Sequence, residues 1–590
     1  MSYLKQTGRR RIQDIDRFGG LDCSGKTGVP GASYELENLR LMPDGSLERR
    51  EGFVPMVDLP ATVRGVGSFV RGDLSETYAV AADKVYYLSK GDDGWSASEI
   101  GTLTTQSGAV DFFYYRGTIF LMDGKSIRVL QPASGDAECV PYIPLYGKDW
   151  GESNSTSRTI HEALNLLSPQ IRIQYKVTTG GSNPTFFIGK NMVQSIDKVV
   201  KNGKVMAASS YKLDSNYSGS SIIIYDNAAS GQIYVVYLTL KADFLEGVGG
   251  VTDCLHAACI GDAENPVLVL YGGSDKNSLY LSEPVEDAQR EEISLCYPDA
   301  LPLYFPVGCA VTLGDGDGEI TGACRHYDRS LIFTSRSVWM TDPYRYVNGE
   351  TTFIPVNTGM GCTAPGAVFL VGNSPISVNG RDIIRWTSQT DERDECNGKV
   401  ISATIRSLMP ESYAKKAQGV VLRGSREVWL YEPGGNEGVF VWQEDRESWT
   451  RFSGFSPEGM FAIEDRIGFY TQTKIFLFDE GATADEAFDG TQTGIRAVYA
   501  SSWMDMGEPR SAKRFLYGHV IADCGEQTVS MAIATPSGRQ ASVELTGTGQ
   551  VFSVMGHRAG VGRFRYLQVR VTAEDEGYFR LYGIRVVTGG

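Results

Sequence analysis

The segment Lys474-Ile475-Phe476-Leu477-Phe478 decides the fold, because its pattern of one polar residue followed by apolar residues recurs along the chain. The aliphatic position of each copy is separated from the next by 42, 152, 59, 45, 45 and 47 residues. Four of the six intervals match the period of about 40–50 residues expected for a four-stranded propeller blade. The other copies are Lys84-Val85-Tyr86-Tyr87-Leu88, Ser126-Ile127-Arg128-Val129-Leu130, Ser278-Leu279-Tyr280-Leu281, Ser337-Val338-Trp339-Met340, Asp382-Ile383-Ile384-Arg385-Trp386 and Glu427-Val428-Trp429-Leu430-Tyr431.

Strand signals dominate the whole sequence, since short runs of Val, Ile, Tyr, Phe and Thr alternate with Gly, Asp, Asn and Ser turns. We therefore predict an all-β protein that contains a β-propeller. Seven copies of the pattern predict seven blades, and six or eight would also fit because one copy lies next to an insertion. Only two stretches read as helical: a capping box at Thr159–Glu162 that leads into Leu167, and the segment from Ser402 to Met409, which resumes from Glu411 to Ala417.

The long interval of 152 residues predicts a domain inserted between blades. Its strands include a hairpin at Val199–Val205 with an Asn202-Gly203 turn, the pair most favoured in two-residue hairpins. We expect an extended N-terminal segment over residues 1–60, first blades over 61–146, an inserted small β domain over 147–250, the remaining blades over 251–492, and a C-terminal β-sandwich over 493–590.

The overall charge is acidic, with 56 Lys and Arg against 71 Asp and Glu and a formal net charge of −15. Proteins that grip nucleic acid usually carry a basic face, so this balance argues against tight binding to phosphates. The chain shows no secretory signal and no apolar run long enough for a membrane helix. Its ten scattered cysteines do not suggest a dense disulfide framework. We expect a soluble protein made in a cytoplasm.

Local motifs give no positive indication of an active site, a cofactor or a metal. Asp315-Gly316-Asp317-Gly318-Glu319 lacks the downstream Glu of a calcium loop, and Cys254, His256 and Cys259 lack the fourth ligand of structural zinc. Arg71-Gly72-Asp73 fits an ordinary turn. The one concentration of basic residues is at the N-terminus, where Lys5, Arg9, Arg10 and Arg11 form either a solvated tail or an arm that docks on an acidic partner subunit.

Three stretches near the N-terminus resemble the opening of bacteriophage tail and head–tail connector propellers, including the nozzle or hub proteins of short-tailed phages. They are Phe18-Gly19-Gly20-Leu21-Asp22, Glu37-Asn38-Leu39 and Asp44-Gly45-Ser46-Leu47-Glu48-Arg49-Arg50-Glu51-Gly52-Phe53. Residues 198–237 resemble β-rich insert domains of phage tail proteins, and Ser502–Arg514 resembles the start of their C-terminal sandwich.

The resemblance implies a non-enzymatic virion structural protein that forms an oligomeric ring, often sixfold, around the DNA exit channel. It further implies a portal or adaptor and other tail subunits as partners, with assembly in the host cytoplasm and DNA passing without specific binding. Two other classes remain open on the sequence. One is a propeller glycan-processing enzyme such as a sialidase-like hydrolase or lyase, and the other is a glycan-binding adhesive propeller.

Overall fold

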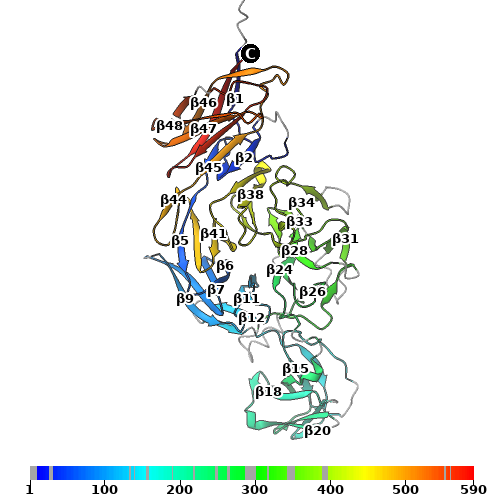
Figure 1. Ribbon diagram of the computed structural model, residues 1–590. Coiled ribbons are helices and arrows are strands. Elements are labelled where there is room, and N and C mark those ends of the chain that lie inside the picture. The colour runs from blue at the N-terminus through cyan, green and yellow to red at the C-terminus, as the bar shows by residue number, and fades with distance from the viewer. Residues whose placement is uncertain are drawn as a thin grey trace, which may run out of the picture. The chain divides into compact units, whose positions relative to one another are not determined.

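The computed structural model describes residues 10–25, 31–92, 94–131, 135–138, 140–153, 158–188, 191–216, 219–245, 247, 250–261, 266–285, 301–314, 318–327, 329–341, 353–388, 396–550, 553–557 and 560–590. The chain divides into two compact units. The first consists of Met1–Ala82, Tyr86–Glu99 and Gly359–Gly590, and the second of Asp83–Val85 and Ile100–Thr358. Both are built from β-strands, as predicted (Figure 1).

Seven sets of four strands recur in the described residues. In six of them, strands that are consecutive in sequence are neighbours in the sheet. In the first unit these sets are β6(Val63–Arg71)-β7(Leu74–Ala81)-β8(Lys84–Gly91)-β9(Gly94–Thr102), most of whose residues belong to this unit, β32(Val368–Val371)-β33(Ser374–Asn379)-β34(Asp382–Ser388)-β35(Cys396–Val400), β36(Gln418–Leu422)-β37(Glu427–Tyr431)-β38(Val439–Gln443)-β39(Ser448–Phe452) and β40(Gly459–Ile463)-β41(Arg466–Thr471)-β42(Lys474–Asp479)-β5(Gly52–Asp58). In the second unit they are β10(Asp111–Tyr115)-β11(Thr118–Met122)-β12(Ile127–Gln131)-β13(Gly135–Glu138), β24(His256–Gly261)-β25(Pro266–Tyr271)-β26(Ser278–Leu281)-β27(Ala310–Thr312) and β28(Ile320–His326)-β29(Arg329–Thr334)-β30(Val338–Thr341)-β31(Phe353–Asn357).

The repeated segments occupy equivalent places in these sets. Six of the seven copies form the third strand: β8, β12, β26, β30, β34 and β42. The copy at Glu427–Tyr431 is β37, the second strand of its set, and the third strand there is Val439–Gln443. The difference arises because β37 begins with the polar Glu427 followed by four apolar residues, as the pattern requires, whereas β38 begins directly with Val439. Both strands are buried along their whole length.

Successive sets share apolar cores within each unit. In the first unit the first strands β32, β36, β40 and β6 contact one another in that order, and in the second unit β10 contacts β24, which contacts β28. One core joins the set of Trp429 to that of Phe469, and another joins Ala79 to Phe461. In the second unit Phe120 packs in one core with Leu270, and Val269 in another with Ile332.

The N-terminal segment completes one of these sets. Strand β5 pairs antiparallel with β42, so a strand from the start of the chain closes a sheet whose other strands lie more than 400 residues later. Phe53 opposes Phe478, and Val57 opposes Ile475.

Residues 145–240 form three smaller sheets in the second unit. Asn202 and Gly203 have φ angles of 50° and 72°, so the predicted Asn-Gly hairpin is confirmed between β18(Val193–Lys201) and β19(Lys204–Val205). The rings of Tyr175 and Phe186 stack in their core with centroids 4.5 Å apart. The sheets are β14(Leu145–Trp150)-β15(Gln170–Lys176)-β23(Ile233–Leu240)-β18(Val193–Lys201)-β19(Lys204–Val205), β17(Thr185–Ile188)-β21(Gly219–Ile224)-β20(Tyr211–Asn216) and β16(Gly181–Ser182)-β22(Asn227–Ala228), with short 3-10 turns η1(Ala208–Ser210) and η2(Ala242–Phe244).

The C-terminal strands form two sheets with strands from the N-terminal segment. β2(Ser33–Glu37) lies between β39 and β45(Ala497–Ser501), which makes one continuous nine-stranded sheet. In the other sheet, β1(Arg10–Ile15) pairs with β52(Arg580–Gly589). In Figure 1 the blue β1 lies among the orange and red strands β46 to β48. The sheets also contain β1(Arg10–Ile15), β2(Ser33–Glu37), β3(Leu39–Leu41), β4(Leu47–Arg49), β45(Ala497–Ser501), β46(Lys513–Asp523), β47(Thr528–Ala534), β48(Gln540–Thr546), β49(Ser553–His557), β50(Arg563–Phe564), β51(Gln568–Ala573) and β52(Arg580–Gly589), and a separate pair is β43(Ala484–Glu486)-β44(Gln492–Gly494).

The predicted helix at Thr159–Leu167 is wrong, because tertiary partners take its capping groups. The Glu162 carboxylate accepts hydrogen bonds from the Tyr142 hydroxyl at 3.0 Å and the Leu145 backbone N–H at 2.6 Å. The buried Asn165 amide donates to the carbonyls of Tyr142 and Leu303. With these groups engaged, the segment contains a bend at His161 and Glu162 and a short turn at Leu166 and Leu167, and no helix.

The second predicted helix is also largely absent. Ser402–Met409 forms turns, and the segment after it contains the single helical turn α2(Tyr413–Lys416). A 3-10 turn η5(Glu444–Arg446) links β38 to β39. Among the described residues, no helix is long and apolar enough to cross a membrane.

Candidate functional site

Arg50 is the centre of the junction between the N-terminal segment and the later strands of the first unit. Its side chain is fully buried, and all five of its N–H donors are used. Nε donates to Asn38 Oδ1 at 3.0 Å, and Nη1 and Nη2 each donate to one carboxylate oxygen of Asp485. The remaining donors bond to the carbonyls of Glu51 and Ser453. A charge buried this deeply is tolerated because every donor has a partner.

Aromatic rings surround the same guanidinium. It lies over the rings of Phe53, Phe455 and Phe478, with distances to the centroids of 5.9, 5.3 and 5.7 Å. Gly52 precedes Phe53 where the chain passes against β43: a Cβ at this position would lie 1.9 Å from the carbonyl oxygen of Ala484. The Arg50-Glu51-Gly52-Phe53 sequence therefore serves to pack the junction.

The preceding residues of the same stretch bind the C-terminal sheets. Arg49 Nη1 donates to the carbonyls of Asp575 and Gly577 at 2.6 and 2.9 Å. Arg580 donates to Asp44 and Ser46 at 2.8 Å each. The residues that carry the phage-tail resemblance thus connect strands at opposite ends of the sequence.

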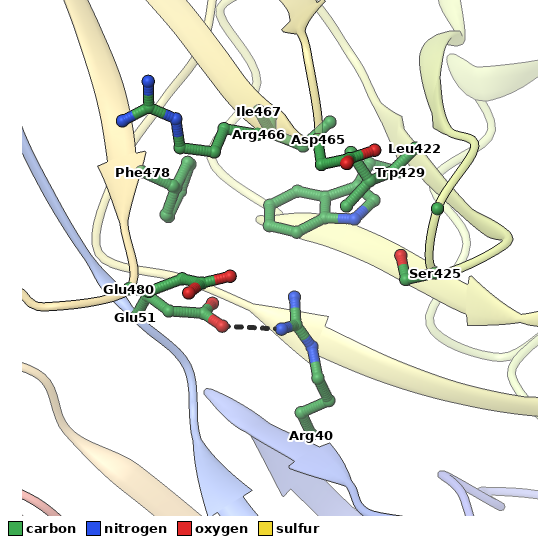
Figure 2. Close-up of a pocket in the computed structure, with 11 residues that line it drawn as sticks. Arg40, Glu51, Leu422, Ser425, Trp429, Asp465, Arg466, Ile467, Phe478 and Glu480 are labelled. Carbon is green, nitrogen blue, oxygen red and sulfur yellow. Dashed lines mark hydrogen bonds and ion pairs between the residues drawn. The ribbon is translucent and has the colours of Figure 1, made fainter.

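A pocket opens beside this junction, between the sets that contain β37 and β42 (Figure 2). Its volume is about 370 Å³. Apolar side chains form the floor, where Trp429 and Phe478 are 1% and 5% exposed. Charged side chains and a serine lie around it. The lining residues are Arg40, Glu51, Leu422, Gly424, Ser425, Trp429, Asp465, Arg466, Ile467, Phe478 and Glu480.

Arg40 is held in this pocket by two carboxylates. Its Nη1 donates to Glu51 Oε1 at 2.7 Å, and its Nε lies 3.3 Å from Oε1 of the buried Glu427. Glu427 also accepts hydrogen bonds from Trp429 Nε1 at 3.0 Å and Gln443 Nε2 at 3.1 Å. Burial disfavours the charge on Arg40, but Glu427 and then Glu51 outweigh it and raise its pKa. Arg40 is therefore a fixed, permanently charged donor.

Two of the four residues of the predicted basic arm, Arg10 and Arg11, lie among the described residues. Lys5 and Arg9 lie outside the described residues. Arg10 and Arg11 are in β1, where Arg10 is exposed. Arg11 forms an ion pair with Glu508 and donates to the carbonyl of Met506 at 3.2 Å. Arg11 is thus engaged within its own chain, and the docking arm stays a prediction because two of its four basic residues lie outside the described residues.

Two of the local motifs that the sequence singled out have structural partners. Arg71 forms an ion pair with Glu76 at 2.6 Å at the β6–β7 hairpin. His256 stacks on Tyr271, and burial lowers its pKa and raises that of Cys254 to about 12. Asp315–Asp317 lie outside the described residues. No group of three or more potential metal ligands occurs in the part of the chain that the structure describes.

Sequence reasoning missed the pocket. Its residues come from the N-terminal segment and two successive sets of strands, so they are far apart in sequence. Glu51 was visible inside the phage-like motif, but nothing in the sequence pairs it with Arg40 or places either one beside Trp429.

Comparison with known proteins gives no assignment. No protein-family model matches this chain, and no curated protein matches it. Among solved structures, a chain from the "Crystal Structure of Mitotic Checkpoint Complex" matches 72% of this chain and 96% of its own length, with 10% sequence identity and a TM-score of 0.34. A similarity at this TM-score carries no argument about fold or function.

Proposed function

We propose that this protein is a non-enzymatic structural component of a bacteriophage tail or head–tail connector, which forms an oligomeric ring around the DNA exit channel. The observation that carries the proposal is the phage-like stretch Asp44–Phe53 and its use in the structure. Arg49, Arg50 and Asp44 each form hydrogen bonds inside the chain. Such a stretch builds a scaffold, which is what the resemblance implies.

The proposed scaffold is a seven-bladed β-propeller with an inserted β domain and a C-terminal β-sandwich. Seven sets of four strands, with first strands in contact in chain order within each unit, support this architecture. The pairing of β5 with β42 supports it further, because a strand from the start of the chain that completes a late blade is an efficient way to close a ring of blades.

In this proposal DNA passes through the ring without being held. The net charge of −15 supports it, since binding to DNA depends on neutralising phosphates with Lys and Arg. The ring would associate with a portal or adaptor and other tail subunits in the virion. Duplex DNA should bind weakly to the purified protein, in a gel-shift assay at low salt. Tight binding with a steep salt dependence would contradict the proposed role.

A glycan-processing propeller enzyme is the second candidate, and the pocket is the observation that favours it. Glu51, Asp465 and Glu480 supply carboxylates of the kind that glycosidases use. Incubation with a panel of oligosaccharides, followed by mass spectrometry of the products, separates the two. The structural role predicts no turnover, whereas turnover that is lost in Glu51→Gln would establish the enzyme.

A further inference from the structure

The pocket beside the junction has a lining in which charges nearly balance. The lining includes two arginines, Arg40 and Arg466, and three carboxylates, those of Glu51, Asp465 and Glu480. A lining of this kind gives little net attraction for an ion. It offers hydrogen-bond donors and acceptors together, above an apolar floor, and this combination is typical of sites that orient small polar molecules.

The polar side chains of the pocket differ in whether they already have hydrogen-bond or ion-pair partners. Arg40 is fixed by Glu51 and Glu427, and Figure 2 shows its guanidinium rising toward Trp429 with Glu51 beside it. The side chains of Asp465 and Glu480 are exposed and have no hydrogen-bond or ion-pair partner among the described residues. The pocket therefore combines one oriented donor with two unused acceptors.

We propose that this pocket binds a neutral polyhydroxylated ligand of the size of one sugar residue. A hydroxyl group both donates and accepts, so neighbouring hydroxyls can donate to Asp465 and Glu480 and accept from Arg40. Trp429 and Phe478 close the base of the pocket, and because their rings are almost fully buried, binding depends on the polar lining. A volume of about 370 Å³ is near the lower end for ligand pockets, which favours one ring over a polymer.

This binding site goes beyond the proposed structural role, because ring assembly does not require it. The ligand has two sources with the same chemistry, a free sugar or the terminal residue of a glycan. Methyl glycosides of glucose, galactose, mannose and N-acetylglucosamine represent the first source. Oligosaccharides that end in the same residues represent the second, and binding to them identifies a glycan terminus as the ligand.

Saturation-transfer NMR on the full-length protein tests the proposal. We expect at least one sugar of the panel to receive saturation. Asp465→Asn combined with Glu480→Gln should weaken its binding roughly tenfold or more, because two hydrogen bonds to charged acceptors are replaced by weaker bonds to neutral amide oxygens. Ser425→Trp should block the pocket without a change of charge. Glu411→Gln, an exposed substitution outside the pocket, is the matched control and should leave binding unchanged.

Two results would overturn the proposal: no transfer to any sugar of the panel, or equal transfer to the wild type and both pocket variants. The oligomeric state of the same samples separates this proposal from the structural one. If the protein forms rings but binds no sugar, only the proposal of sugar binding is refuted. If it binds sugar but remains monomeric, only the proposed ring assembly is refuted.

Discussion

Arg50 and Asp485 form a buried two-pronged ion pair, with Nη1–Oδ1 and Nη2–Oδ2 distances of 2.8 and 2.7 Å. The two residues are 435 positions apart in the sequence, so the pair joins the N-terminal segment to the region after the last repeated strand. Arg50 also bonds to Ser453 and lies over Phe455. The junction therefore links three segments of the first unit that are far apart in the sequence.

Replacement of Arg50 by Met should destabilise the first unit strongly. The substitution leaves Asp485 buried without its partner, which typically costs about 3–5 kcal/mol. Urea unfolding followed by tryptophan fluorescence measures the loss. Arg423→Met is the control, because Arg423 is exposed, and a similar loss in both variants would contradict the importance of the pair.

Gly52→Ala should also destabilise this junction. The added Cβ would lie 1.9 Å from the Ala484 carbonyl oxygen, so the backbone of β5 or β43 must move. We expect a clearly lower melting temperature in differential scanning calorimetry. Gly560→Ala adds a methyl group with no atom within 4 Å and should leave the melting temperature unchanged. Equal behaviour of the two variants would show that the contact at Gly52 is not restrictive.

Asp111 should make stability depend on pH. Its pKa is raised to about 6 by burial, against hydrogen bonds from the backbone N–H groups of Ala257 and Phe112. Between about pH 4 and 6 the folded state therefore binds more protons than the unfolded state. The contribution of Asp111 to the free energy of unfolding is present at low pH and is lost as the pH rises through 6. His256 Nδ1 lies 3.9 Å from Asp111 Oδ2, and burial lowers the pKa of His256. The contribution of His256 to the free energy of unfolding therefore rises with pH, opposite to that of Asp111.

The pH effect is best measured in a His256→Gln background. We expect the melting temperature of this protein to fall between pH 4 and 6 relative to that of the same protein with Asp111→Asn. If the difference between the two proteins stays constant over this range, Asp111 does not titrate there in the folded state.

Deletion of residues 2–9 tests the proposed docking arm. The deletion removes Lys5 and Arg9 but keeps β1, so the melting temperature should change little. Association into rings, or with the partner subunit, should weaken and lose part of its salt dependence, because fewer charges are paired across the contact. Sedimentation velocity at several salt concentrations makes the comparison. Unchanged association at every salt concentration would show that residues 2–9 are a solvated tail and not a docking arm.

Much of the fold could be predicted because its signals are local. The period of the repeated strands depends on alternating apolar runs and turns, and Asn202-Gly203 fixes a hairpin by its own backbone preference. The failures have tertiary causes. Glu162 satisfies the capping pattern of a helix, yet its carboxylate bonds to Tyr142 and Leu145, and no local pattern reveals this.

The pocket could not be predicted for a related reason. Arg40 and Glu51 belong to the N-terminal segment, whereas Trp429 and Phe478 belong to two late sets of strands. Their proximity depends on the pairing of β5 with β42 and on the junction at Arg50, and both are contacts between distant parts of the chain.

Electron microscopy of the purified, negatively stained protein tests the central claim most directly. The proposed role predicts closed rings with an open centre, sixfold if the protein follows the pattern that the resemblance implies. Single particles without rings at every protein concentration examined would contradict an assembly around a DNA channel.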